Sequence, residues 1–437
     1  MSSADFRQAH PFLWLSIMAC SSCSVRQANV LGDKLRHMIA TKVIQEVERS
    51  LDLLQGMMVF LQWPHCHTSD KPWMSFWTNL AVAIAQDLGF TTLTGETAFT
   101  YIKKFWLPKN PCRQPQANST RTMEERRIIL ALYVWTTTYA QMVRRDNPLP
   151  WTPFMEQSLR ALMNQPEWEG DSILAAQVRS SLVGLQITDL SIQQALRGEV
   201  RIPLFFHQSL SSQMEEIWRT LPSNLLNNET VLIHLHATEV AVHEIGLSVE
   251  PSINNMDTIK RLNALRSCLN ALENFFQAWD RITPSQYMGL TFNMFVHLLN
   301  CIVALFRLST LDNIPGWDPT EARSRLPLFT MLDHIAEQMD ATTSAIPIIN
   351  DESPNEDVAR ATVWAKAGRV MRLIKQGIKR DFPDLDPLGS IESVAAMSTG
   401  STGIQVPPPD VQDPFFANFA DDPWLSAIFV PWDSMNF

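Results

Sequence analysis

The chain has 437 residues, 46% of them hydrophobic, and a formal net charge of −10 at pH 7. This length and apolar share indicate a globular protein with a large core and exclude a disordered chain. No apolar run reaches the roughly 18 residues that a membrane helix needs, and no stripe of lysine and arginine marks a surface for nucleic-acid phosphates.

The first predicted element is the apolar stretch PFLWLSIMAC, residues 11–20. A secretion signal requires a positively charged start, but Asp5 and Arg7 balance each other here. Cys20 and Cys23 have the spacing of zinc ligands, yet no second pair with suitable spacing follows them. We therefore expect a core helix with small, buried or half-buried thiols, and neither a leader nor a metal site.

Two more helices are predicted between residues 50 and 89. The stretch that starts at Ser50 is apolar nearly all round and ends at Pro64, which predicts a buried helix. From Trp73 to Leu88 the apolar residues share one helical face, and Gly89 stands where a C-cap is expected.

The middle of the chain continues with helical patterns. Thr122 and Glu125 form a capping box that opens a helix to about Val143, and Asp171 and Thr283 are plausible N-caps further on. The further helices are predicted at about 155–165, 171–197, 208–220, 229–247, 257–280, 284–310, 325–343 and 356–380. Since no alternating strand pattern with hairpin turns occurs, we predict an all-α fold.

The composition changes at the C-terminal end. Residues from Asp381 onward contain nine carboxylates and no lysine or arginine. Small, polar and proline residues make 381–409 a predicted flexible linker, which follows a helical domain at 1–380. Residues 410–437, here called the tail, interleave aspartates with aromatic side chains, and we predict that the tail is disordered or loosely packed. The aromatic residues of the tail are Phe415, Phe416, Phe419, Trp424, Phe429, Trp432 and Phe437.

Acidic and aromatic residues without a helical face are the composition of a transcriptional activation segment. Carboxylates keep the bulky apolar groups solvated until these dock in a hydrophobic groove of a partner. The alternative is a strap that packs on the protein's own helices, and composition alone leaves both open. The side chains expected to contact a partner are Phe415, Phe416, Phe419, Trp424, Phe429 and Trp432.

Three groups of residues have side chains that could bind a metal, and none of them predicts a metal or cofactor site. His65, Cys66 and His67 are adjacent and point in different directions, so one ion would need further ligands. His236, Glu239 and His243 share a helical face, but no motif elsewhere completes a site, and histidines at a helix interface are the better interpretation. Aspartate clusters such as the one at 381–386 lie among prolines and not on a helix, which argues against an all-α enzyme of the terpene-synthase kind.

Four segments together resemble the middle homology region of fungal binuclear zinc-cluster transcription factors. In chain order they are HPFLWL at residue 10, ERSLDLLQG at 48, DLG at 87 and R-T-x-E-E-R-R at 121. The ordered set covers roughly residues 7 to 200 and implies a helical regulatory domain, in which Cys20 and Cys23 fall inside the first helix. The six-cysteine zinc cluster that precedes this region in the family is absent, so no metal ligand or DNA-reading residue carries over.

The resemblance implies a nuclear, pathway-specific transcriptional regulator of the secondary-metabolite type and not an enzyme. Its expected partners are the transcription machinery or a DNA-binding protein, with homo- or heterodimers as an option, and direct DNA binding by this chain alone is not expected. A second hypothesis is a ligand-sensing or dimerising co-regulator that represses or titrates a full-length relative.

Overall fold

The computed structural model describes residues 2–63, 74–91, 121–143, 145–196, 204–248, 255–312, 314–346, 363–382 and 385, and it confirms the all-α prediction for them. The α-helices are α1 (Ser3–Ala9), α2 (Pro11–Cys20), α3 (Val25–Ile39), α4 (Leu51–Gln62), α5 (Met74–Asp87), α7 (Met123–Val143), α8 (Pro153–Asn164), α9 (Glu169–Leu196), α10 (Leu204–Arg219), α11 (Glu229–Glu244), α12 (Asn255–Trp279), α13 (Phe292–Thr310), α14 (Pro319–Arg325), α15 (Leu328–Ala345) and α17 (Val363–Asp381). A π-helix, η1 (Ala40–Gln45), continues α3, and short 3-10 helices are η4 (Ser223–Leu225), η5 (Ile245–Ser248) and η6 (Pro284–Gly289).

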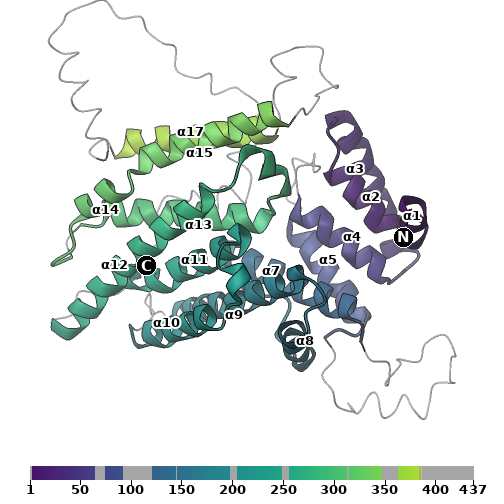
Figure 1. Ribbon diagram of the computed structural model, residues 1–437, viewed down its shortest axis with the longest axis horizontal. Helices are drawn as coiled ribbons and strands as arrows, with labels where there is room; N and C mark the ends of the chain where they lie inside the picture. The colour runs from purple at the N-terminus through teal and green to yellow at the C-terminus, as the bar shows by residue number, and fades with distance from the viewer. Residues whose placement is uncertain are drawn as a thin grey trace, which may run out of the picture.

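The helices bury three apolar clusters that share elements. The N-terminal cluster joins α2 to α5 with α7 and α8, the C-terminal cluster joins α11 to α15 with α17, and a smaller one lies between α9, α10 and α11. Phe292 and Val296 of α13 belong to the N-terminal cluster, whereas Leu298 and Leu305 belong to the C-terminal one. The long central helices α9, α11 and α13 therefore tie the body together (Figure 1).

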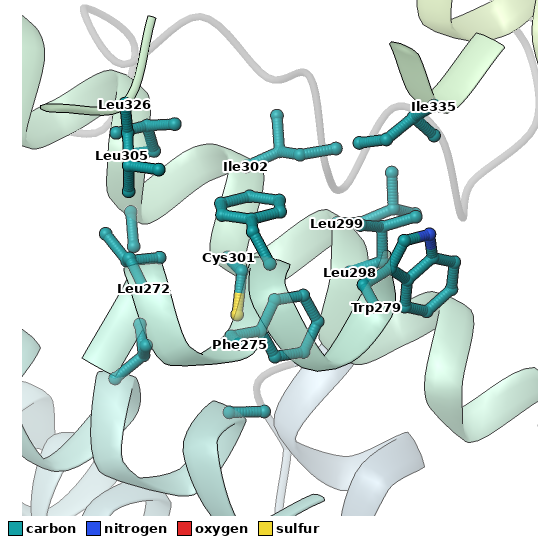
Figure 2. Packing of buried hydrophobic residues seen from close by; sticks show 14 of the residues in the cluster. Leu272, Phe275, Trp279, Leu298, Leu299, Cys301, Ile302, Leu305, Leu326 and Ile335 are labelled. Atoms are coloured by element: carbon teal, nitrogen blue, oxygen red, sulfur yellow. The ribbon is translucent and has the colours of Figure 1, made fainter. Parts of the chain in front are cut away.

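Aromatic and aliphatic side chains of α12 and α13 fill the C-terminal cluster. Phe275 and Trp279 of α12 lie beside the α13 residues Leu298 and Ile302, with Ile335 of α15 above them (Figure 2). Helix α13 is also long and apolar enough to cross a membrane by composition, but 72% of that window is buried inside the body. A buried core helix passes the same test, and the contacts of α13 identify it as one.

The first predicted helix is present, but its second cysteine is outside it. Cys20 is the last residue of α2 and is buried, as predicted. Cys23 is exposed and lies in the turn before α3, so its expected place inside the helix and its expected burial are both wrong. The reason is a second start signal: the Ser24 hydroxyl accepts the Gln27 N–H at 3.0 Å and caps a new helix.

Two predicted helices are interrupted. The segment predicted at 284–310 is divided into η6 and α13, because Leu290 and Thr291 adopt extended backbone and Thr291 becomes the N-cap of α13. The helix predicted at 325–343 starts at Leu328, after a separate α14, since Leu326 precedes Pro327 and proline disfavours helical backbone before it. Of the helix predicted at 356–380, the part from Val363 is present as α17, and 356–362 lie outside the described residues. The remaining predicted helices are present with ends that differ by a few residues.

Helices α2 and α4 approach closely at Gly56. A Cβ atom there would lie 2.3 Å from Cδ1 of Phe12 and 2.9 Å from Oγ of Ser16. We expect Gly56→Ala to lower the free energy of unfolding by about 1–3 kcal/mol, because overpacking moves a fully buried ring. Gly377→Ala in α17 is the matched control: its Cβ meets no atom within 4 Å, so helix propensity should make it neutral or stabilising. Urea denaturation of both variants measures their free energies of unfolding, and equal midpoints would contradict the prediction.

Candidate functional site

The four segments that carry the family resemblance meet around the N-terminus of α4. The Asp52 carboxylate of ERSLDLLQG accepts the backbone N–H groups of Phe12 and Leu13 at 3.0 and 2.9 Å, and so caps the start of α2 in HPFLWL. From the same segment, Nε of Arg49 donates to Asp87 of the DLG sequence at 2.6 Å. Three of the four segments are thus joined by charge-assisted hydrogen bonds.

The fourth segment, R-T-x-E-E-R-R, joins this network from the start of α7. Arg121 forms an ion pair with Glu125 at 2.9 Å and donates to the carbonyl groups of Leu88 and Gly89, at the end of α5. The predicted capping box is confirmed, since the Thr122 hydroxyl accepts the Glu125 N–H at 3.2 Å and the Glu125 carboxylate accepts the Thr122 N–H at 2.8 Å. The motif residues therefore fix helix ends against one another.

Arg127 extends the network to α9. Its Nε and one terminal nitrogen bind the two oxygens of Asp171 at 2.6 and 3.0 Å, and it also pairs with Glu167. The Asp171 side chain is only 1% exposed. Burial raises its pKa, but the hydrogen bonds from Arg127 and from backbone N–H groups outweigh burial and hold the pKa of Asp171 below its ordinary value. Asp171, predicted as an N-cap, is instead an internal partner within the first turn of α9.

A shallow pocket of about 190 Å³ opens beside this ion pair. It is bounded by helices α4, α7 and α9, and its wall includes Gln55, Glu124, Arg127, Trp168 and Leu174. Gln55 donates to Glu124 at 2.6 Å across α4 and α7. The motif residues Gln55, Glu124 and Arg127 therefore line a surface depression as well as connecting the helices.

Buried histidines of α11 form a second polar network, which the sequence does not predict. His234 and His297 of α13 are hydrogen bonded ring to ring at 3.1 Å, and His243 is bonded in the same way to His207 of α10 at 2.8 Å. Burial lowers the pKa of His297 and of His243 to about 4, and burial together with its neighbour His297 lowers that of His234. All three rings are therefore neutral at physiological pH.

His236, Glu239 and His243, which were predicted to share one face of α11, do not converge on one point. Glu239 accepts from Trp218 Nε1 at 2.6 Å and contacts His236 Nδ1 at 2.8 Å, whereas His243 turns to His207. In the described ranges, no group of three or more histidine, cysteine, aspartate or glutamate side chains is placed to hold a metal ion. These histidines line helix interfaces, as the sequence interpretation has it.

The other candidate residues lie outside the described ranges. They are the residues 65–67, the aspartates Asp384 and Asp386, and the aromatic residues Phe415, Phe416, Phe419, Trp424, Phe429 and Trp432. Asp381, the first aspartate of the cluster at 381–386, is described as the last residue of α17. The pairings of Arg127 with Asp171 and of His234 with His297 were missed because their partners are 44 and 63 residues apart in the sequence. No short-range pattern signals such a pair.

Comparisons with known proteins agree with the resemblance. A family model described as a C-terminal domain, ATEG07667_C, matches residues 284–434. Transcription factor opdL of Penicillium oxalicum is 30% identical over 385 residues, which is 87% of this chain and 67% of that protein. A protein named Transcription factor from Aspergillus terreus is 21% identical, over 84% of this chain and 56% of its own length. Transcription factor himD of Aspergillus japonicus is 20% identical, over 78% and 58%. No solved structure matches the chain.

The chain thus spans about two thirds of opdL and less than two thirds of the other two relatives. The matched region of opdL extends over most of the helical body. On this similarity, the chain belongs to a family of fungal transcription factors.

Proposed function

We propose that the chain regulates transcription in the nucleus, through a helical regulatory body and an acidic-aromatic tail. The observation that carries this proposal is the 30% identity to transcription factor opdL over 87% of the chain. The body is rich in interhelical hydrogen bonds but, in the ranges described, offers no metal cluster, so its polar groups serve structure. The resemblance further supports a pathway-specific role.

The proposed organisation has three parts: a regulatory domain at 1–380, a linker at 381–409 and the tail at 410–437. The last described helix, α17, ends at Asp381, where the basic residues also end. Because this sequence carries neither a six-cysteine cluster nor a basic stripe, we propose that a partner protein or a further segment supplies the contact with DNA. The tail then recruits the transcription machinery.

A reporter assay tests the tail. Residues 381–437 fused to a heterologous DNA-binding domain should activate transcription, and changing Phe415, Phe416, Trp424 and Trp432 to alanine should reduce the activity to background, because these side chains supply the apolar contacts. A matched control changes polar residues of the same segment to alanine, namely Gln412, Asn418, Ser426 and Asn436, and should keep the activity. A fusion that is expressed but inactive would overturn the activation role and favour a packed strap.

A further inference from the structure

Helix α17 presents one face to the body. Trp364 and Met371 are buried in the C-terminal cluster, and Ile374 and Ile378 pack against it. The Trp364 ring contacts Tyr287 of η6, with ring centres 5.6 Å apart. Helix α15 is the main helix partner of α17, and the two lie together along one edge of the molecule (Figure 1).

The opposite face of α17 is here called the outer stripe. Its residues recur at three- and four-residue spacing and so lie in one row along the helix. They are Arg369, Val370, Leu373, Gln376, Gly377 and Arg380. Val370 and Leu373 are half-buried and belong to none of the three apolar clusters. A Cβ at Gly377 would meet no atom within 4 Å, so the row is open at this point.

The charges of α17 differ between its flank and the outer stripe. On the flank, Arg372 and Lys375 pair with Asp340 and Asp333 of α15. The outer stripe adds two more cations, Arg369 and Arg380, and no carboxylate. The only acid in the sequence of α17 is Asp381 at its end, which contacts Arg380 at 2.7 Å. The outer stripe is therefore an apolar row between positive charges.

We propose that the outer stripe binds the tail, residues 410–437, of the same chain. The tail has the complementary chemistry: five aspartates, seven aromatic residues and no lysine or arginine. Aromatic rings would cover Val370 and Leu373, and aspartates would lie beside Arg369 and Arg380. The family model that matches 284–434 includes both α17 and most of the tail in one unit, which is consistent with a shared role.

The connecting segment has a suitable length. Residues 382–409 would span a root-mean-square distance of about 30 Å as a flexible chain, and the 19 residues of α17 are about 28 Å long. The tail can thus reach any part of the outer stripe, at an effective concentration of roughly millimolar. Weak contacts suffice at such a concentration. This inference builds on the proposed activation role, since a tail held on α17 is withheld from the transcription machinery.

Site-specific cross-linking in the full chain tests the contact. The photoreactive residue p-benzoylphenylalanine replaces Gln376 of the outer stripe in one protein and Asn263, an exposed residue of α12, in the control. Mixing unlabelled and ¹⁵N-labelled protein separates links within one chain from links between chains. We expect links from position 376 to residues 410–437 of the same chain, and none from position 263. Links only to other segments or only between chains, or no link from a folded protein, would overturn the proposal.

Charge reversal tests the recognition. Arg369→Glu with Arg380→Glu should lower the cross-link yield at least fivefold, whereas Lys260→Glu with Arg266→Glu on α12 makes the same change of net charge and should leave the yield unchanged. Equal yields in both variants would contradict the electrostatic contact. Cross-linking needs no transcriptional activity, so a tail that docks but does not activate would overturn only the proposed function.

Discussion

Replacing Arg127 by methionine should lower the free energy of unfolding by about 2–4 kcal/mol, somewhat less than the cost of breaking a fully buried ion pair, because the arginine is 26% exposed. The methionine keeps much of the apolar stem but leaves Asp171, whose side chain is 1% exposed, without its bidentate partner. A buried carboxylate without a counter-charge either protonates or draws water into the interface between α7 and α9. Urea denaturation at pH 7 measures the loss.

Two comparisons make this prediction specific. Arg160→Met removes an ion pair with Glu156 on α8 whose arginine is 72% exposed, and it should cost less than about 1 kcal/mol. Adding Asp171→Asn to Arg127→Met should recover part of the stability, because the amide keeps an acceptor for the Glu167 N–H but carries no charge. A loss for Arg127→Met as small as that for Arg160→Met would show that the pair does not hold α9 in place.

Sequence patterns predicted the helices because the signals are local. The capping box at Thr122 and the start at Pro284 are completed within three or four residues, so their chemistry is legible in a short window. The junction of the four family segments was not predicted, although every segment was recognised. Asp52 reaches back to the start of α2, 40 residues earlier, and such a contact depends on tertiary packing that no periodicity encodes.

The same distinction explains the errors. Cys23 was assigned to the first helix because the family resemblance implies it, but the competing start signal at Ser24 determines the backbone. His236, Glu239 and His243 were correctly predicted to share one face of α11. However, Glu239 binds Trp218 and His243 binds His207, both on α10, so the three side chains do not form one site. Periodicity thus predicts which residues share a face, and only the packing shows what that face meets.

The stability of the body should decrease as the pH falls below about 6.5, because two buried histidine pairs, His234 with His297 and His207 with His243, have lowered pKa values in the folded chain. Each hydrogen-bonded pair needs one ring as donor and one as acceptor, so the pairs between His234 and His297 and between His207 and His243 are built from neutral rings. Burial lowers the pKa of His297 and of His243 to about 4 in the folded chain. In the unfolded chain, these groups return to an ordinary value of about 6.5.

Above pH 6.5 both states hold these rings neutral, and stability does not depend on them. Between pH 6.5 and 4 the unfolded chain binds protons that the folded chain excludes, so each such histidine should cost about 2 kcal/mol between pH 7.5 and pH 5. Urea midpoints at pH 7.5, 6.5, 5.5 and 5 measure the slope. His297→Gln combined with His234→Asn should make the slope clearly smaller, with the His207–His243 pair supplying what remains, whereas His37→Gln, on an exposed face of α3, should leave it unchanged. The double variant removes two of the histidines that bind protons only in the unfolded chain. An unchanged slope in this variant would therefore mean that other groups cause the loss of stability at low pH.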